Sequence, residues 1–186
     1  MKFCSNCGHA VESKVPDGDH QPRFVCPSCT TIHYDNPRII AGCIPEWEGK
    51  ILLCRRAIEP RRGFWTLPGG FMENGESVQD AAAREAQEEA LADVEIGSLA
   101  AIVNVIRAHQ VHIMFRARLR DGKFGVGPES LEVALYDEQD IPWQDIAFLS
   151  GEFALRRYLE DRRAGRELAH FRDIDYRDGQ LVIRDR

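Results

Sequence analysis

The hydrophobic pattern of the chain consists mainly of short apolar runs of strand length. The runs at residues 39–47 and 50–56 are separated by a polar turn that ends in glycine, so they predict a β-hairpin. Three further runs, at residues 94–106, 111–119 and 131–137, also predict strands. The sheet that these runs predict would form the main part of the protein.

Two segments have the spacing of helices instead. Residues 77–90 are rich in alanine, and Ser77 with an aspartate three residues later is a signal for a helix start. Residues 151–165 place apolar side chains at helical spacing and end in glycine. In residues 170–186 two short alternating runs flank an Asp-Gly pair, which predicts a second hairpin. Strands mixed with two helices predict an α/β domain.

Composition limits the range of functions. With 186 residues, 44% apolar and 29% charged, the chain is long enough for one core of ordinary size and a small appendage. A net charge of −6 argues against a nucleic-acid surface spread over the whole molecule, so nucleic acid is an unlikely partner. No run approaches the ~20 apolar residues of a membrane span, and the first residues lack the apolar core of a signal peptide. We therefore expect a cytoplasmic protein without a membrane partner.

The amino-terminal cysteines have the spacing of a zinc site. Cys4 and Cys7 form one C-x-x-C pair, Cys26 and Cys29 form another, and 18 residues separate the pairs. This spacing is typical of four-thiolate structural zinc sites, and the polar segment between the pairs has little to bury without a metal. Two disulfides or unliganded thiols are the alternatives. The sequence predicts a structural Zn²⁺ bound by the four thiolates.

A cluster of glutamates stands out in the segment at residues 77–90. Glu85, Glu88 and Glu89 are three or four residues apart or adjacent, so on a helix they share one face. Like charges at these spacings destabilise a helix, and the helix dipole disfavours anions near its carboxyl end. Only Arg84 lies within the cluster as a base. A hard divalent cation, Mg²⁺ or Mn²⁺, would supply the missing positive charge, whereas an acidic solvated face is the alternative.

The segment as a whole resembles the Nudix box, whose pattern is G-x5-E-x7-R-E-U-x-E-E-x-G-U, with U an apolar residue. Its six fixed positions from the first glycine to the last glutamate match at Gly70, Glu76, Arg84, Glu85, Glu88 and Glu89. The late glycine is replaced by Leu91 and the last apolar position is Ala92. Glycine there ends the helix, so this departure concerns the end of the helix and not the metal ligands.

With its cysteine pairs, the chain is similar to Nudix hydrolases that carry an amino-terminal zinc ribbon, and it looks most like plant chloroplast pyrophosphatases acting on FAD and ADP-ribose. This resemblance implies an α/β/α sandwich with a mixed sheet, preceded by a small zinc ribbon. It also implies Mg²⁺-dependent cleavage of a nucleoside diphosphate derivative to release AMP, and a homodimer. We expect the ribbon at residues 1–33, the Nudix domain at 37–145, and a carboxyl-terminal helix and hairpin tail at 146–186.

The resemblance also implies roles for individual residues. Glu85, Glu88, Glu89 and the Gly69 carbonyl would bind the catalytic metal, and Arg84 would pair with Glu76 to hold the loop against the helix. The general base would be a box glutamate, Glu85 or Glu88, or a glutamate on a later loop; of Glu129 and Glu132 we favour Glu132.

Substrate contacts are predicted from residue type. Arg55 or Arg56 could pair with phosphate, and Phe64 could stack on a flat ring, although aromatic residues before a Pro-Gly-Gly loop are as often packing residues. The motif that accompanies NADH pyrophosphatases is absent, and Arg107 replaces the proline of many ADP-ribose pyrophosphatases. Hydrolysis is therefore the favoured function. A nucleotide-binding sensor whose zinc ribbon contacts a partner is the alternative.

Overall fold

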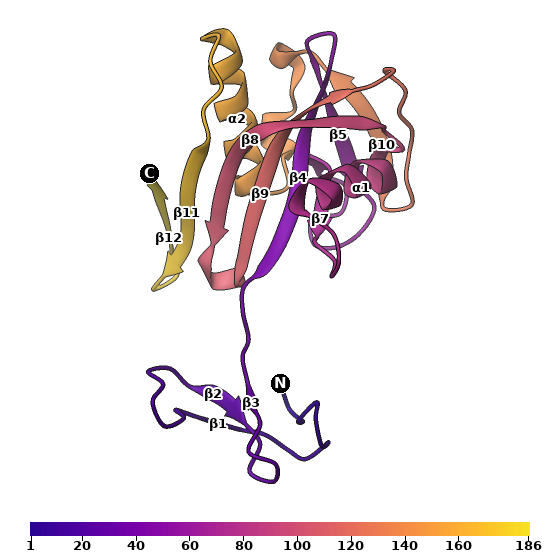
Figure 1. The fold of residues 1–186 in the computed structure, drawn as a ribbon. Coiled ribbons are helices and arrows are strands. Elements are labelled where there is room, and N and C mark those ends of the chain that lie inside the picture. The colour runs from indigo at the N-terminus through magenta and orange to yellow at the C-terminus, as the bar shows by residue number, and fades with distance from the viewer. The chain divides into compact units, whose positions relative to one another are not determined.

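The computed structural model describes residues 1–186 and divides them into two compact units, Met1–Pro37 and Arg38–Arg186. In the first unit, three short strands, β1 (Glu12–Lys14), β2 (Arg23–Val25) and β3 (Ile32–His33), form an antiparallel sheet in the order β1-β2-β3 (Figure 1). Two of the amino-terminal cysteines are among the few buried side chains of this unit. It therefore has the character of a ribbon with almost no apolar core.

The second unit is built on one mixed sheet with a helix on each face. Its main elements, in chain order, are β4 (Arg38–Trp47), β5 (Lys50–Arg56), β6 (Trp65–Thr66), β7 (Gly69–Phe71), α1 (Val78–Ala90), β8 (Val94–Val105), β9 (Gln110–Leu119), β10 (Ser130–Tyr136), α2 (Leu149–Arg163), β11 (His170–Arg177) and β12 (Gln180–Asp185). Three short 3-10 turns, Ile106–Ala108, Glu138–Asp140 and Trp143–Asp145, complete it.

The strands follow the order β10-β5-β4-β9-β8-β11-β12, with β6 pairing with β5 and β7 pairing with β4. The pairs β4–β9 and β8–β11 are parallel and the other pairs are antiparallel. The predictions of an α/β fold and of a mixed sheet are confirmed.

Two apolar cores cover the two faces of this sheet, because successive side chains of a strand point to opposite faces. On β5, Leu52 and Cys54 pack in the core beneath α1, while Ile51 and Leu53 pack in the core beneath α2. The core beneath α1 is lined largely by the alanines of that helix, so α1 approaches the sheet closely. Figure 1 shows the two helices on opposite sides of the sheet.

Both predicted hairpins are confirmed. The turn between β4 and β5 has positive φ at Glu48 and Gly49, and the turn between β11 and β12 has positive φ at Asp178 and Gly179. Paired positive φ values are typical of the tight turns that match the twist of a hairpin. Neither helix of the protein is long and apolar enough to cross a membrane.

The carboxyl-terminal segment is part of the main sheet. Strand β11 lies parallel to β8 along residues 170–174, and β12 follows it at the edge. Helix α2 packs its apolar side against the sheet face opposite α1. Residues 146–186 therefore share one compact unit with residues 38–145, and the predicted boundary at residue 145 stays a prediction.

Candidate active site

Helix α1 begins where the sequence predicted. The Ser77 hydroxyl accepts a hydrogen bond from the Asp80 N–H at 3.1 Å, and the Asp80 carboxylate accepts one from the Ser77 N–H at 3.3 Å. This reciprocal capping box satisfies backbone donors that would otherwise lack partners at the helix start. The capping box fixes where the helix begins, and contacts from Arg84 to the Phe71 carbonyl and from the Gly69 N–H to Glu89 hold its acidic face against β7.

Arg84 is the centre of the acidic face. Its guanidinium donates to both oxygens of Glu76, at 3.1 and 2.9 Å, and to the carboxylates of Glu85 at 2.8 Å and Glu88 at 3.1 Å. A further bond of 3.1 Å reaches the Phe71 carbonyl on β7. One arginine thus ties the helix to the preceding loop, and its planar fork makes this arrangement specific to arginine.

The carboxylates differ in burial. Glu85 and Glu89 are 9% and 7% exposed, while the Glu88 side chain is half exposed. Burial raises the pKa of Glu85 above its usual value. Burial also raises the pKa of Glu89 to about 7; the N–H of Gly69 and the charge of Arg56 oppose this, and the charges of Glu85 and Glu129 add to it. The positive charge near Glu89 is too small to offset the burial of its carboxylate. A carboxylate in this condition is expected where a protein binds a cation.

The glycines of the loop make room for these carboxylates. A Cβ atom at Gly70 would lie 2.5 Å from the Glu85 carboxylate, so only glycine fits there. The N–H of Gly69 donates to the Glu89 carboxylate at 3.1 Å. Backbone and two buried carboxylates therefore meet at one place. These oxygen donors suit a hard divalent cation, and the expected ligand role of the Gly69 carbonyl stays a prediction.

The carboxyl end of α1 is held by a distant loop that sequence reasoning missed. Leu91, which stands at the late glycine position of the box, adopts the left-handed conformation itself, with φ of 49°. The N–H groups of Gly125 and Gly127 donate to the carbonyls of Ala90 and Glu89, at 2.7 and 3.1 Å. The Ser130 hydroxyl donates to the same Glu89 carbonyl at 2.7 Å. We call residues 125–130 the cap loop.

The cap loop has no room for a larger residue at Gly127. A Cβ atom there would lie 1.9 Å from the Glu88 carbonyl oxygen. Glycine, proline and serine at residues 125–130 signal a loop in the sequence, but its contact with α1 bridges some forty residues. Leu91 and Ala92 satisfy the Gln87 and Ala86 carbonyls as a glycine-based helix end would, and the cap loop supplies donors to the carbonyls of Glu89 and Ala90.

The two loop glutamates occupy different positions. Glu132 lies opposite Arg55 in the β10–β5 register, 3.5 Å from its guanidinium, and shares its sheet face with Tyr136, which packs in the core beneath α2. Glu129 lies in the cap loop, two residues after Gly127. Burial is the main cause of the raised pKa values of Glu85 and Glu89, and the negative charge of Glu129 raises both further. The structure therefore brings Glu129, and not the favoured Glu132, to the acidic cluster.

The predicted substrate contacts also separate. Arg55 donates to the Gly63 carbonyl at 2.9 Å and pairs with Glu132, on the face opposite α1. Arg56 donates to the Pro60 carbonyl at 2.9 Å, and its guanidinium lies 5.0 Å from the centre of the Phe148 ring. Phe64 is half buried, with the Arg61 guanidinium 5.2 Å from its ring centre. These three residues line the loop after β5, but only Arg56 faces α1.

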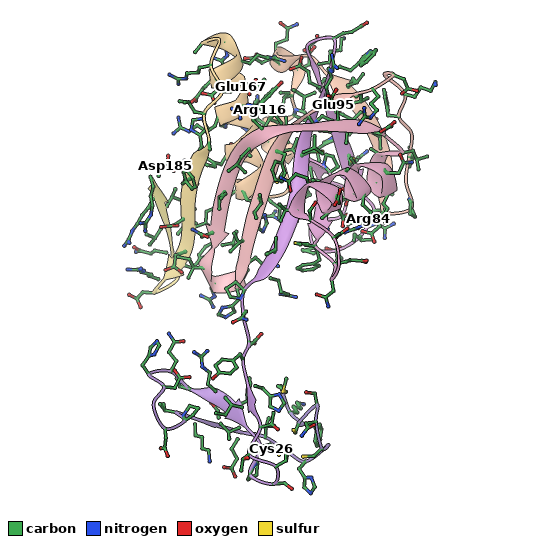
Figure 2. The ribbon with its side chains drawn as sticks, in the orientation of Figure 1. Cys26, Arg84, Glu95, Arg116, Glu167 and Asp185 are labelled. Atoms are coloured by element: carbon green, nitrogen blue, oxygen red, sulfur yellow. The ribbon has the colours of Figure 1, made fainter.

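The four amino-terminal cysteines converge in the ribbon, where Figure 2 labels Cys26. Their sulfurs all lie within 4.8 Å of one another; the Cys4–Cys29 and Cys7–Cys26 pairs are 3.6 and 3.4 Å apart. Ligands at the Zn–S distance of a tetrahedral site are about 3.8 Å apart. The His33 ring nitrogen lies 3.2 Å from the Cys4 sulfur, within hydrogen-bond distance. The cluster fits one zinc ion, and no other cluster of this kind occurs in the chain.

A cavity of about 620 Å³ lies between β8, β9 and the end of α2, and none of its lining residues belongs to the acidic cluster. Figure 2 labels three of its residues, Glu95, Arg116 and Glu167, away from Arg84 of the acidic cluster. Its charges already have partners: Arg118 pairs with Glu95 at 3.0 Å, and Glu167 accepts from a serine at 2.6 Å. The arginines that line the cavity are all paired with acidic residues, and the acidic cluster remains the candidate active site.

Comparison with known families agrees with this geometry. The family described as Nudix N-terminal matches residues 2–35, and the NUDIX domain family matches residues 36–155, well over half of the chain. The protein belongs to the Nudix hydrolase family, and it carries that family's amino-terminal zinc-ribbon module. The prediction of a Nudix hydrolase with an amino-terminal ribbon is confirmed.

Several relatives are similar over most of this chain. A solved NUDIX hydrolase from Nitrosomonas europaea is 55% identical, with a TM-score of 0.89 over 92% of this chain and 97% of that one. The ADP-ribose pyrophosphatase of Methanocaldococcus jannaschii is 32% identical over 59% of this chain and 67% of its own length. The NAD-capped RNA hydrolase NudC of Stutzerimonas stutzeri is 28% identical over 89% of this chain, which spans only 58% of that protein.

Proposed function

We propose that the protein is a Mg²⁺-dependent pyrophosphohydrolase that cleaves the diphosphate of a nucleoside diphosphate derivative, such as ADP-ribose or FAD, and releases AMP. The observation that carries this proposal is the pair of buried carboxylates, Glu85 and Glu89, which share too little positive charge for their burial. A diphosphate resists attack because its oxygens are negatively charged. A divalent cation held there would neutralise that charge and lower the pKa of a bound water.

The residues of the site would have separate roles. Glu85, Glu88 and Glu89 would hold the cation, with the Gly69 backbone beside them. Arg84 would keep the helix and the loop in register and would not touch the substrate. For the general base we now favour Glu129 over Glu132, because Arg55 engages Glu132 on the other face of the sheet. Glu129 would accept the proton of the attacking water.

The proposed substrates are suggested by the activities for which the relatives are named. ADP-ribose is supported by the similarity to the archaeal and Streptococcus suis ADP-ribose pyrophosphatases, the second of which is 26% identical with a TM-score of 0.61. NAD-capped RNA is supported by the similarity to NudC. FAD rests on the resemblance of the sequence to the plant pyrophosphatases alone.

A panel of diphosphates tests the proposal. Purified protein with Mg²⁺ is incubated with ADP-ribose, FAD, NADH, a dinucleoside polyphosphate and NAD-capped RNA, and the products are identified chromatographically. The free nucleotides would give AMP and a partner product, whereas NAD-capped RNA would give nicotinamide mononucleotide and RNA with a 5′-monophosphate. We expect AMP from at least one member, and none from the same protein carrying Glu89→Gln. If no member yields AMP even at high enzyme concentration, the proposal is wrong. Nucleotide binding without turnover would favour a sensor instead.

The structural zinc is a separate proposal. We expect one zinc per chain by elemental analysis of the protein purified without added metal, because four thiolates at these distances form a complete tetrahedral ligand set. Cys26→Ser should lower that content, whereas Cys43→Ser in the core of the main unit should not. Equal zinc in both variants would contradict the assignment. The homodimer and the cytoplasmic location stay predictions, and light scattering of the purified protein tests the first.

A further inference from the structure

Strand β5 ends in two consecutive arginines that point to opposite faces of the sheet. Arg55 shares a face with Leu53, in the core beneath α2, and is engaged by Glu132 and by the Gly63 carbonyl. Arg56 therefore shares its face with Cys54, in the core beneath α1. Only the second arginine is turned toward the helix that carries the acidic cluster.

Arg56 lies directly beside that cluster. It is the register partner of Ser130, whose hydroxyl donates to the Glu89 carbonyl at 2.7 Å. The N–H of the next residue, Ala57, donates to the Glu129 carbonyl at 2.8 Å. Arg56 nevertheless forms no ion pair, although most of the chain's arginines do. An unpaired guanidinium beside buried carboxylates is unusual, because those carboxylates would themselves be its natural partners.

Two contacts hold the Arg56 side chain in place. Its Nε atom donates to the Pro60 carbonyl at 2.9 Å, and the Phe148 ring lies 5.0 Å from the guanidinium carbon. The ring supports the guanidinium by a cation–π contact. The two terminal nitrogens remain without a protein acceptor. They are the donors that bind two oxygens of one phosphate in a fork.

We propose that Arg56 binds the diphosphate of the substrate next to the metal ligands, and that Phe148 is a positioning residue that orients the Arg56 guanidinium. This inference rests on the proposed function and deepens it. It chooses between the two arginines that the sequence left open. It also gives the segment after residue 145 a part in the active site, because Phe148 is the residue that precedes α2.

Steady-state kinetics with ADP-ribose and Mg²⁺ test this inference in the full-length protein. Arg56→Gln should lower kcat/KM about 10- to 100-fold, because a charge-assisted hydrogen bond to phosphate is lost. Arg56→Lys should recover only part of it, since lysine keeps the charge but not the fork. Phe148→Leu should raise KM several-fold with little change in kcat, and Phe148→Tyr, which keeps the ring, should restore the wild-type KM.

The matched control is Arg107→Gln, which removes an exposed arginine without a partner at the β8–β9 corner and should change kcat/KM less than twofold. The melting temperature of each variant separates loss of binding from loss of fold. The inference is overturned if Arg56→Gln stays within twofold of wild type, or if Arg55→Gln loses as much as Arg56→Gln. It is also overturned if Phe148→Tyr is as impaired as Phe148→Leu.

The inference and the proposed function can fail separately. If wild type turns over ADP-ribose and Arg56→Gln has no effect, the inference is wrong and the proposed function stands. If wild type does not turn over ADP-ribose, the hydrolase proposal fails for this substrate, and calorimetric titration of ADP-ribose in Mg²⁺ then measures binding directly. Weaker binding in Arg56→Gln than in wild type would support the role of Arg56. Equal binding, or no binding to wild type, would overturn it.

Discussion

Both helices bury carboxylates against the sheet, but the partners of those carboxylates differ. On α2, the Asp161 side chain is 1% exposed and accepts hydrogen bonds from Arg116 at 2.8 Å, Arg166 at 3.0 Å, His170 at 2.9 Å and the Leu168 N–H at 3.1 Å. On α1, Glu85 and Glu89 are nearly as buried. Glu85 accepts from Arg84, which is divided among three carboxylates, and Glu89 accepts only from the Gly69 N–H and forms no ion pair.

The difference appears in the pKa values. Burial by itself raises the pKa of Asp161, but hydrogen bonds from His170, the Leu168 N–H and Arg166 outweigh it and bring the pKa to about 2. Burial raises the pKa of Glu89 to about 7, and the N–H of Gly69 and the charge of Arg56 do not compensate. Asp161 is thus a completed structural centre that joins α2 to β9 and β11, whereas Glu89 belongs to a centre that a cation would complete.

The largest expected effect comes from breaking the completed centre. Asp161→Asn should lower the free energy of unfolding of the main unit by roughly 3–5 kcal/mol, because the buried Arg116 loses its counter-charge. Urea unfolding followed by tryptophan fluorescence measures this, since all three tryptophans lie in residues 38–186. The control Glu160→Gln, an exposed neighbour paired with Arg157, should change it by less than about 0.5 kcal/mol. Equal effects would mean that the Asp161 centre is not structural.

The same chemical change on α1 should have the opposite sign. Because the pKa of Glu89 in the folded state, about 7, is above its ordinary value of 4.5, the metal-free protein loses stability as the pH rises from about 4.5 through 7. Glu89→Gln removes this loss, so in EDTA at pH 8 the variant should be more stable than wild type by up to about 3 kcal/mol. Added Mg²⁺ should stabilise wild type and not the variant.

A second glutamate on the same helix tests whether burial causes the pH-dependent gain in stability of Glu89→Gln. Glu88→Gln replaces a half-exposed carboxylate and should show little or no pH-dependent gain in EDTA. The interpretation is wrong if Glu89→Gln is less stable than wild type at pH 8, or if the two variants behave alike. Stabilisation together with lost turnover would mark Glu89 as a residue kept for function at a cost in stability.

The sequence predicted what depends on local pattern. The long strands of the main sheet, both helices and both hairpins follow from periodicity and turn residues, and the cysteine and glutamate spacings pointed to both candidate metal sites. The short strands of the ribbon and those at residues 65–66 and 69–71 were not predicted. What it missed depends on contacts between distant segments. The choice between Glu129 and Glu132 depends on the start of β10: Glu132 follows the irregularity there and lies opposite Arg55, while Glu129 precedes the strand and stays in the cap loop. The position of β11 beside β8, and the cap loop that closes α1, likewise require the folded sheet.

The cap loop distinguishes the α1 centre further, because it contacts the metal-ligand helix and itself carries Glu129. Gly127→Ala should lower the stability of the main unit by about 2 kcal/mol, since a Cβ atom 1.9 Å from the Glu88 carbonyl forces backbone to move. Gly151→Ala on α2 is the matched control: its Cβ atom would meet nothing within 4 Å, so it should be neutral or stabilising. Thermal melting of both variants measures this, and a harmless Gly127→Ala would contradict the close contact.

The smallest expected effect is at Ser130, whose buried hydroxyl joins the cap loop to the Glu89 carbonyl. Ser130→Ala should cost about 1 kcal/mol of stability, whereas Ser98→Ala, which removes an exposed hydroxyl bonded to Glu167, should cost less than half of that. If the cap loop positions Glu129, Ser130→Ala should also lower kcat for ADP-ribose several-fold with little change in KM. Asp161→Asn, assayed well below its melting temperature, should leave kcat close to wild type. A loss of kcat in Asp161→Asn as large as that in Ser130→Ala would erase the functional difference between the two buried centres.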